Sequence, residues 1–181
     1  MQIINVDLID ESLVQHDDLV KACKEIINEN LRTNGGTLKI ADIFERDFKW
    51  TNLVVVIVNN QVVGFALVRE SENKHNLKEA SSYYYLSDIV VKKEFRNQGI
   101  GELILKTVIS SIGDDPLVAS VLKDNLPSIR FLLKCMKCYS VSDSGKYYRF
   151  VDAKTYDKFY GEEINDVLVG VDTDQKSSKR M

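Results

Sequence analysis

The period of the hydrophobic pattern changes several times along the chain. In some stretches apolar residues recur every three or four positions, which is the spacing of a helix with one buried face. This pattern predicts helices at 17–31, 38–48, 99–112 and 128–138. Other stretches alternate apolar with polar residues or are rich in β-branched and aromatic residues, which predicts strands at 2–9, 53–58, 62–68, 83–91, 117–122, 139–141 and 147–151.

The order of these elements indicates the fold class. One strand and two helices precede three strands, and the tight turn Asn59–Gln61 joins two of the strands in a hairpin. A helix, a strand, a second helix and a closing pair of strands follow. We therefore expect a single-domain α/β (α+β) fold, with a mixed, mostly antiparallel sheet of about seven strands flanked by about four helices. The domain is expected at 1–151, and 152–181 should form an extension that is partly docked and then frayed.

Composition excludes several classes of protein. The chain has 181 residues, 44% apolar and 28% charged, which suffices for a globular core, and no apolar run approaches the length of a membrane span. A net charge of −3, with charges of both signs interspersed, gives no basic stripe for nucleic acid. The first residues lack the features of a secretion signal, so we expect a cytoplasmic protein.

The three cysteines give no disulfide framework and no metal site. Their number is odd, and the pair Cys135 and Cys138 lacks the second pair of Cys or His residues that zinc requires. We interpret Cys135 and Cys138 as reduced thiols that pack on a helix.

The segment 95–101, Phe-Arg-Asn-Gln-Gly-Ile-Gly, carries the strongest chemical signal. It lies between a strand that ends near Val91 and a helix that begins within the loop. The first amides of a helix have no partner inside it and carry partial positive charge, so they attract anions. Gly99 and Gly101 allow close approach of a phosphate, and Arg96 adds a cation. An ordinary strand-to-helix turn with a solvated Arg96 is the alternative.

The surroundings of this loop resemble those of a known family. Residues 88–101, Asp-Ile-Val-Val-x-x-x-Phe-Arg-x-x-Gly-Ile-Gly, are similar to the core motif of the GNAT superfamily of acyl-CoA-dependent N-acetyltransferases. Downstream, Asn125-x-x-Ser128 stands where that family has Asn-x-x-Ala. The order of elements over 1–151 is also that family's order.

The resemblance implies that the protein uses acetyl-CoA as co-substrate and needs no metal. The backbone amides of Asn97, Gln98, Gly99, Ile100 and Gly101 should hold the pyrophosphate. The main chain of Ile89, Val90 and Val91 should contact the pantetheine arm, and Asn125 should bond to the arm from the other side, with Ser128 in the same motif.

Asp88 is the best candidate for a catalytic base. It lies on the strand beside the expected thioester, among apolar neighbours that favour a raised carboxyl pKa. The alternatives are that Asp88 binds a cationic substrate, caps a turn or faces the other side of the sheet, because one residue of register reverses its direction.

The general acid is where the chain departs from the family. Many members carry a Tyr seven residues after the motif Asn, and this chain has Leu132 there. Tyr139, Cys135 or solvent would have to protonate the thiolate instead. The family typically reacts by direct attack in a ternary complex, so no cysteine nucleophile is required. Met136 and Lys137 also replace the Gly-Phe pair usual at that helix end.

The acceptor is expected to be a primary amine, of a small molecule or of a protein. The tyrosines of 83–85 and 147–148 are placed either to line a cleft for a cationic amine or simply to pack in the sheet. We expect no nucleic-acid or membrane partner, and a homodimer is compatible with the sequence. The alternative function is an acyl-CoA-binding pseudoenzyme or interaction module of the same fold, which the loss of the Tyr at Leu132 allows.

Overall fold

The protein was analysed as a computed structural model, which describes residues 1–7, 17–34, 50–72, 82–142 and 144–159. The chain forms two compact parts, residues 1–119 and 120–181. The helix expected at 38–48 lies outside the described residues. None of the helices in the described ranges is long and apolar enough to cross a membrane.

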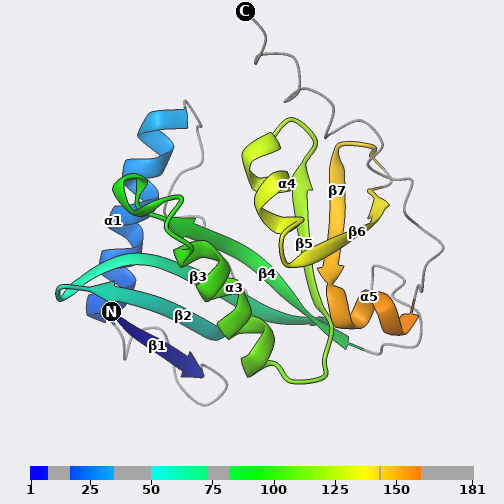
Figure 1. Ribbon diagram of the computed structural model, residues 1–181, viewed down its shortest axis with the longest axis horizontal. Coiled ribbons are helices and arrows are strands. Elements are labelled where there is room, and N and C mark those ends of the chain that lie inside the picture. Colours follow the sequence, from blue (N-terminus) through cyan, green and yellow to red (C-terminus); the bar gives the residue numbers. More distant parts are fainter. Residues whose placement is uncertain (8–16, 35–49, 73–81, 143, 160–181) are drawn as a thin grey trace, which may run out of the picture. The chain divides into compact units, whose positions relative to one another are not determined.

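The expected fold class is confirmed. The strands form a mixed, mostly antiparallel sheet in the order β1-β2-β3-β4-β5-β7-β6, and Figure 1 shows them with the helices. The strands are β1 (Gln2–Asp7), β2 (Trp50–Val58), β3 (Gln61–Glu72), β4 (Ser82–Val91), β5 (Leu117–Leu122), β6 (Met136–Val141) and β7 (Tyr147–Asp152). The helices are α1 (Asp17–Asn34), α3 (Ile100–Ser111), α4 (Leu126–Leu132) and α5 (Ala153–Phe159), and a 3-10 turn, η2, covers Lys93–Phe95.

The first part is built on four antiparallel strands, β1 to β4. Asn59 and Asn60, with φ of 49° and 60°, form the two-residue turn between β2 and β3, as expected for a hairpin whose turn needs positive φ at both positions. The strand predicted at 62–68 is longer than expected, because β3 continues to Glu72. Cross-strand pairing with β4 extends the strand through these polar residues, from Arg69–Tyr85 to Glu72–Ser82.

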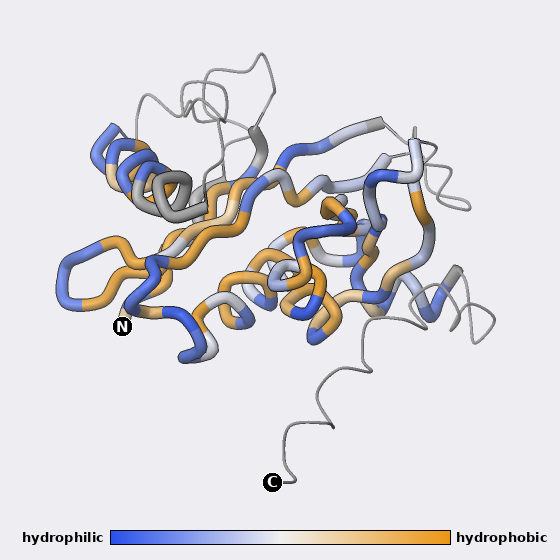
Figure 2. The backbone as a smooth tube through the Cα atoms, turned by 90° about the horizontal axis from the view of Figure 1, so that it is seen from above, coloured by the Kyte–Doolittle hydropathy of each residue, from blue (hydrophilic) through white to orange (hydrophobic). Residues whose placement is uncertain are grey.

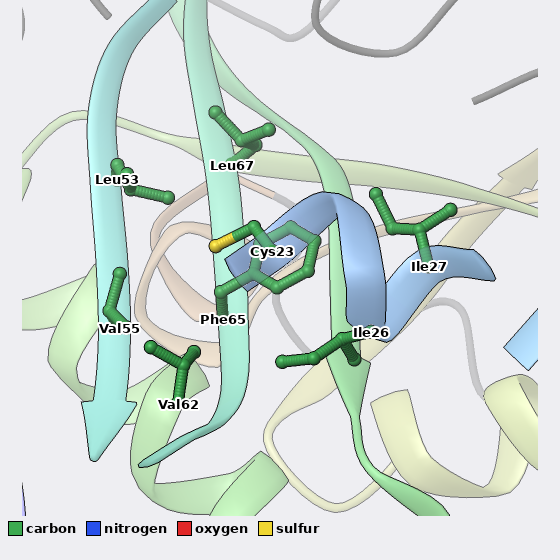
Figure 3. Close-up of a cluster of buried hydrophobic side chains, with 8 residues drawn as sticks. All are labelled: Cys23, Ile26, Ile27, Leu53, Val55, Val62, Phe65 and Leu67. Atoms are coloured by element: carbon green, nitrogen blue, oxygen red, sulfur yellow. The ribbon is translucent and has the colours of Figure 1, made fainter. Parts of the chain in front are cut away.

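Helices α1 and α3 cover opposite faces of this sheet. Cys23, Ile26 and Ile27 of α1 are buried against one face, as Figure 3 shows. Helix α3 packs against β2, β3 and β4, and Figure 2 shows α1 and α3 on either side of the apolar strands. The residues buried on the α1 face alternate with those on the α3 face, so both faces of the central strands are apolar. Those on the α1 face are Leu53, Val55, Val62, Phe65 and Leu67.

Gly64 of β3 sets how closely α3 approaches the sheet. A Cβ at this position would lie 3.0 Å from Cδ1 of Ile104, 3.0 Å from the carbonyl oxygen of Val90 and 3.2 Å from Cγ2 of Val91. Contacts this short are rare for a Cβ atom, so the neighbouring atoms would have to move by a few tenths of an ångström. The missing side chain therefore lets Ile104, which is fully buried, seat α3 directly on β3 and β4.

In the second part the sequence pattern was wrong about one helix. The helix expected at 128–138 covers only Leu126–Leu132, and β6 begins at Met136. Residues 136–138 are buried, exposed and buried in turn, which is the period of a strand, and they pair with β7. Leu133, the C-cap of α4, is 38% exposed. Cys138 consequently packs from a strand, and Cys135 lies in the turn after α4.

Helix α5 closes the second part. The Asp152 side chain accepts a hydrogen bond from the Thr155 amide at 2.9 Å, which caps the first turn of α5. Tyr156 is 3% exposed, and Lys137 of β6 bonds to Asp157 at 2.6 Å. The start of the C-terminal extension is thus docked on β6 and β7. Tyr160 and the residues after it lie outside the described ranges, and the boundary expected at 151/152 stays a prediction.

Candidate active site

Hydrogen bonds hold the chain where β4 leaves the sheet. The Lys92 amide donates to the carbonyl of Val63 at 2.8 Å, which ties the end of β4 to β3. After the turn η2, Nε of Arg96 donates to the carbonyl of Val91 at 3.0 Å, and Nε2 of Gln98 donates to the carbonyl of Glu94 at 3.0 Å. Two side chains of the predicted loop therefore hydrogen-bond to the loop's own backbone. Arg96 is exposed, and the guanidinium nitrogens other than Nε take no part in this bond.

The backbone of the loop turns its amides away from internal partners. Asn97 and Gly99 have φ of 59° and 80°, and Gly99 is the N-cap of α3 without any side-chain cap. The first helical bond runs from the Leu103 amide to the Gly99 carbonyl, at 3.0 Å. Within the part of the chain that the structure describes, the amides of residues 97–101 donate no hydrogen bond. These donors sit at the positive end of a helix of 12 residues.

Space above the loop matches this arrangement of donors. A Cβ at Gly99 would meet no heavy atom within 4 Å, so the backbone there is open on its outer side. Ile100 is 6% exposed and anchors the first turn of α3 in the core. Glu102, also in this turn, opposes the positive field in part. The loop has the features of an anion site with fixed geometry: free amides, an adjacent cation and an open approach.

The register of β4 decides which way Asp88 points. Asp88 pairs with Leu67 and Leu86 pairs with Val68, so Ser87 is an extra residue that forms a β-bulge. Paired residues share a face of the sheet, and Leu67 belongs to the cluster under α1. Asp88 therefore lies on the α1 face and Leu86 on the α3 face. Without the bulge both would lie on one face.

Among the described residues, the edge of β4 away from β3 has no strand partner over the residues expected to contact pantetheine. The parallel ladder between β4 and β5 consists of Tyr84–Leu117 and Tyr85–Val118. Ile89, Val90 and Val91 pair with β3 on the other side and are half-buried. Their main chain is thus available for an extended ligand to bond along this edge, in the manner of an added strand.

In the second part, Asn125 caps its own helix. Its Oδ1 accepts a hydrogen bond from the Ser128 amide at 3.3 Å, so the structure brings these two predicted residues together. The contact of Asn125 and Ser128 with the cosubstrate, which the family resemblance implies, stays a prediction.

The second part contains no evident general acid where the family has one. Leu132 is 2% exposed and carries no proton. Tyr139 lies on β6, in a stretch that the sequence predicted as strand, and is 6% exposed. Burial raises the pKa of Cys138 to about 11, with backbone hydrogen bonds to Ser140 and Arg149 acting in the opposite direction, and it raises the pKa of Cys23 to about 12 in the first part. Neither thiol is a thiolate at neutral pH.

Two cations occupy faces of the tyrosines that were candidates for binding an amine. The Arg69 guanidinium lies 5.0 Å from the centre of the Tyr85 ring, and in the second part the Lys123 ammonium lies 5.1 Å from the Tyr148 ring. Tyr83 is 3% exposed and packs in the core. The strand predicted at 62–68 stopped short of Arg69, so this residue was not among the predicted site residues. The alternation Phe65, Leu67, Arg69 was the signal available.

Comparison with known proteins identifies the family. The sequence profile of the Acetyltransferase (GNAT) family matches residues 20–136, so the chain belongs to this family. No curated protein sequence matches the chain.

Solved structures resemble the chain in fold, at low sequence identity. A GNAT-family structure from Desulfovibrio desulfuricans has a TM-score of 0.60 at 14% identity, covering 83% of this chain and 97% of that one. The PaiA N-acetyltransferase of Thermoplasma acidophilum, solved with coenzyme A, has a TM-score of 0.55 at 15% identity, with 84% and 99% covered. An acyl-CoA N-acyltransferase from Pseudomonas aeruginosa has a TM-score of 0.57 at 11% identity, with 84% and 99% covered.

Proposed function

We propose that the protein transfers an acetyl group from acetyl-CoA to a primary amine, with residues 97–101 as the pyrophosphate site. The observation that carries this proposal is the uncapped N-terminus of α3, where five consecutive amides have no partner within the described residues and Gly99 leaves the approach open. Membership of the GNAT family and the coenzyme A bound to the Thermoplasma protein support the choice of ligand.

In the proposed reaction the neutral amine attacks the thioester carbonyl directly. A C–N bond forms, the C–S bond breaks, and the products are an amide and the thiol of coenzyme A. Asp88 accepts the proton that the amine loses, either directly or through a water molecule. Asp88 lies on the α1 face next to the bulge at Ser87, and the strand that carries it is half-buried there.

The departing thiolate takes its proton from solvent in this scheme. Leu132 offers none, and the buried thiols Cys23 and Cys138 hold their protons too firmly at neutral pH. A thiol with an ordinary pKa near 8.5 is an adequate leaving group without a dedicated acid. A slow enzyme is the expected consequence.

Leu132 also supports a second candidate function, a protein of this fold that binds acyl-CoA without turning it over. Both functions require the α3 site. They differ only in whether an amine is acetylated.

Binding and turnover separate these functions. Titration calorimetry with acetyl-CoA and free CoA measures the first, and release of the CoA thiol with a panel of polyamines, amino sugars, amino acids and lysine peptides measures the second. Binding with thiol release supports the transferase. Binding without release on any amine supports the module, and absence of binding rejects both.

Asp88→Asn tests the base. We expect kcat to fall by about 100-fold or more while CoA affinity is kept, because general-base catalysis typically contributes that much. Asp115→Asn removes an exposed carboxylate from the same part of the chain and should change neither quantity. Unchanged turnover in Asp88→Asn would remove Asp88 from the mechanism and leave the binding site intact.

A further inference from the structure

Helix α5 covers one end of a face formed by β6 and β7. Val151 of β7, which pairs with Lys137 of β6, is fully buried. Lys137 bonds to Asp157 of α5 at 2.6 Å, and its ammonium lies 4.9 Å from the centre of the Tyr156 ring. Paired residues point to the same side of a sheet, so α5 lies on the side of Lys137 and Val151, which we call the α5 face.

The other end of the α5 face carries exposed apolar side chains. Alternation along β7 places Tyr147 on this face, four residues before Val151. The Lys123 amide, at the end of β5, donates to the Lys146 carbonyl, at the start of β7, at 3.0 Å, so these neighbouring strands run antiparallel. This bond sets Leu122 of β5 beside Tyr147. Leu122 is 44% exposed and Tyr147 is 39% exposed.

Two polar groups between these ends lack a partner. Arg149 of β7 lies midway between Tyr147 and Val151 and pairs with Ser140 of β6, so both belong to the α5 face. Oγ of Ser140 is buried without a hydrogen-bond partner. The guanidinium of the half-buried Arg149 makes neither an ion pair nor a hydrogen bond among the described residues. A carboxylate would satisfy both groups, because it accepts hydrogen bonds from each.

The sequence that follows α5 is complementary to this surface. Residues 162–174 contain five acidic residues and no basic one. The apolar residues of this segment are mostly β-branched: Ile164, Val167, Leu168, Val169 and Val171. Acidic and apolar residues alternating in this way match a surface that offers a cation, a hydroxyl and two exposed apolar side chains.

The segment also begins at the right place and is long enough. Helix α5 ends at Phe159 on the face that it covers, and Figure 1 shows it directly after β7. The seven residues of α5 measure about 10 Å and the six of β7 about 20 Å. Residues 160–168 in extended form span about 30 Å, which reaches back to Tyr147 even if α5 points away from it.

We propose that residues 164–171 dock on the open end of the α5 face of their own chain. Their apolar side chains pack on Leu122 and Tyr147, and a carboxylate of the segment bonds to Arg149 and Ser140. The occupant is this chain's own segment because its tether begins on the same face, which gives it a high effective concentration there. The docking does not depend on the proposed acetyltransferase activity.

Hydrogen exchange of the full-length protein, followed by mass spectrometry, tests the docking. We expect the amides of residues 164–171 to exchange about 10-fold or more slowly than those of an unstructured chain. Exchange at the unstructured rate overturns the proposal. Protection should be equal at a tenfold lower protein concentration, because the contact is within one chain. Protection that is lost on dilution would assign the face to the segment of a second copy and overturn docking within the chain.

Substitution of an apolar side chain assigns the protection to the α5 face. Tyr147→Ser should speed exchange of 164–171 by about 10-fold, because the segment loses an apolar contact. Leu133→Ser, at a position of similar exposure, 38%, on α4, should leave this exchange unchanged. Amides of β6 and β7 in the same data show whether the second part stays folded. Unchanged protection in Tyr147→Ser would place the segment elsewhere and overturn the proposal.

Substitution of the cation tests the polar contact separately. Arg149→Gln should speed exchange of 164–171 by about 10-fold, the loss of a charged hydrogen bond, and Arg149→Lys should give an intermediate value. Arg130→Gln, at an exposed position on α4, changes the net charge equally and should have no effect. Equal acceleration in Arg149→Gln and Arg130→Gln would show that net charge alone attracts the segment, which overturns the assigned pairing.

Discussion

The two strand-to-helix junctions of this protein differ in how the backbone amides at the helix N-terminus are paired. Helix α4 follows β5 and is capped by its own chain, because Oδ1 of Asn125 accepts from the Ser128 amide at 3.3 Å. Helix α3 follows β4 and has Gly99 as an N-cap without a side-chain oxygen. The amides of residues 97–101 are left without a partner within the described residues.

This difference separates a structural helix end from a candidate binding site. A self-capped terminus has already used its donors and gains little from an anion. An uncapped terminus keeps several exposed donors that a ligand can take over from water, and it has the longer helix, 12 residues against 7, behind it. Braces from Arg96 and Gln98 to the carbonyls of Val91 and Glu94 keep the donors in one arrangement.

Gly99→Val should produce the largest effect. The new side chain would occupy the open space over the amides, and φ of 80° strains any residue with a Cβ. We expect CoA affinity, by calorimetry, to fall by about 100-fold or more, the loss of about two charged hydrogen bonds. Gly113→Val is the matched control, because Gly113 has φ of 68° and equally open surroundings at the other end of α3. Similar losses of affinity in the two variants would show that strain alone is responsible.

Gly64→Ala should push α3 away from β3. The loop before α3 would then lose part of its fixed arrangement, which reduces the difference between the two junctions. The contacts at 3.0 Å with Ile104 and the Val90 carbonyl predict a loss of about 1–3 kcal/mol in the free energy of unfolding, measured by urea denaturation. Adding Ile104→Val, which removes Cδ1, should recover part of that loss, whereas Ile104→Val alone should destabilise. Simple additivity of the two changes would contradict the assigned contact.

Asn125→Ala tests the other junction. Loss of the cap should cost about 1 kcal/mol of unfolding free energy, and Asn125→Asp, which keeps the accepting oxygen, should retain most of it. The Asp variant also asks whether the amide nitrogen contacts the cosubstrate. Lower CoA affinity at unchanged stability would show that it does, and unchanged affinity would limit Asn125 to its helix.

The smallest effect concerns the thiols. Burial raises the pKa of Cys23 to about 12 and that of Cys138 to about 11, so both should stay protonated and unreactive toward an aromatic disulfide reagent at pH 8. Cys135, in the turn after α4, is half-buried and should react first. Because the unfolded thiols lose protons near pH 9, the stability from burying them is complete below that pH and declines toward pH 11 to 12. Rapid reaction of three thiols in the native protein would contradict this burial.

Sequence patterns predicted the first junction well and the second less well. The apolar stripe of α3 and the glycines before it are local signals, and the loop occurs where they place it. After α4 the pattern fits a helix or a strand equally over a few residues, so Met136 was assigned to the wrong element. Pairing with β7, which is distant in sequence, decides in favour of the strand.

The sequence by itself determined the order of the strands along the chain, the glycine-bearing loop and the family, because these depend on local periodicity and on a continuous motif. Only the tertiary structure decided on which face of the sheet Asp88 lies and where α4 ends. The extra residue at Ser87 reverses the face of the sheet to which each earlier side chain of β4 points. Local residue propensities predict neither this bulge nor a cross-strand pair. The loop proposed to hold the cosubstrate is therefore predicted from the chain alone, whereas the facing of Asp88, the proposed base, depends on how strands far apart in sequence align.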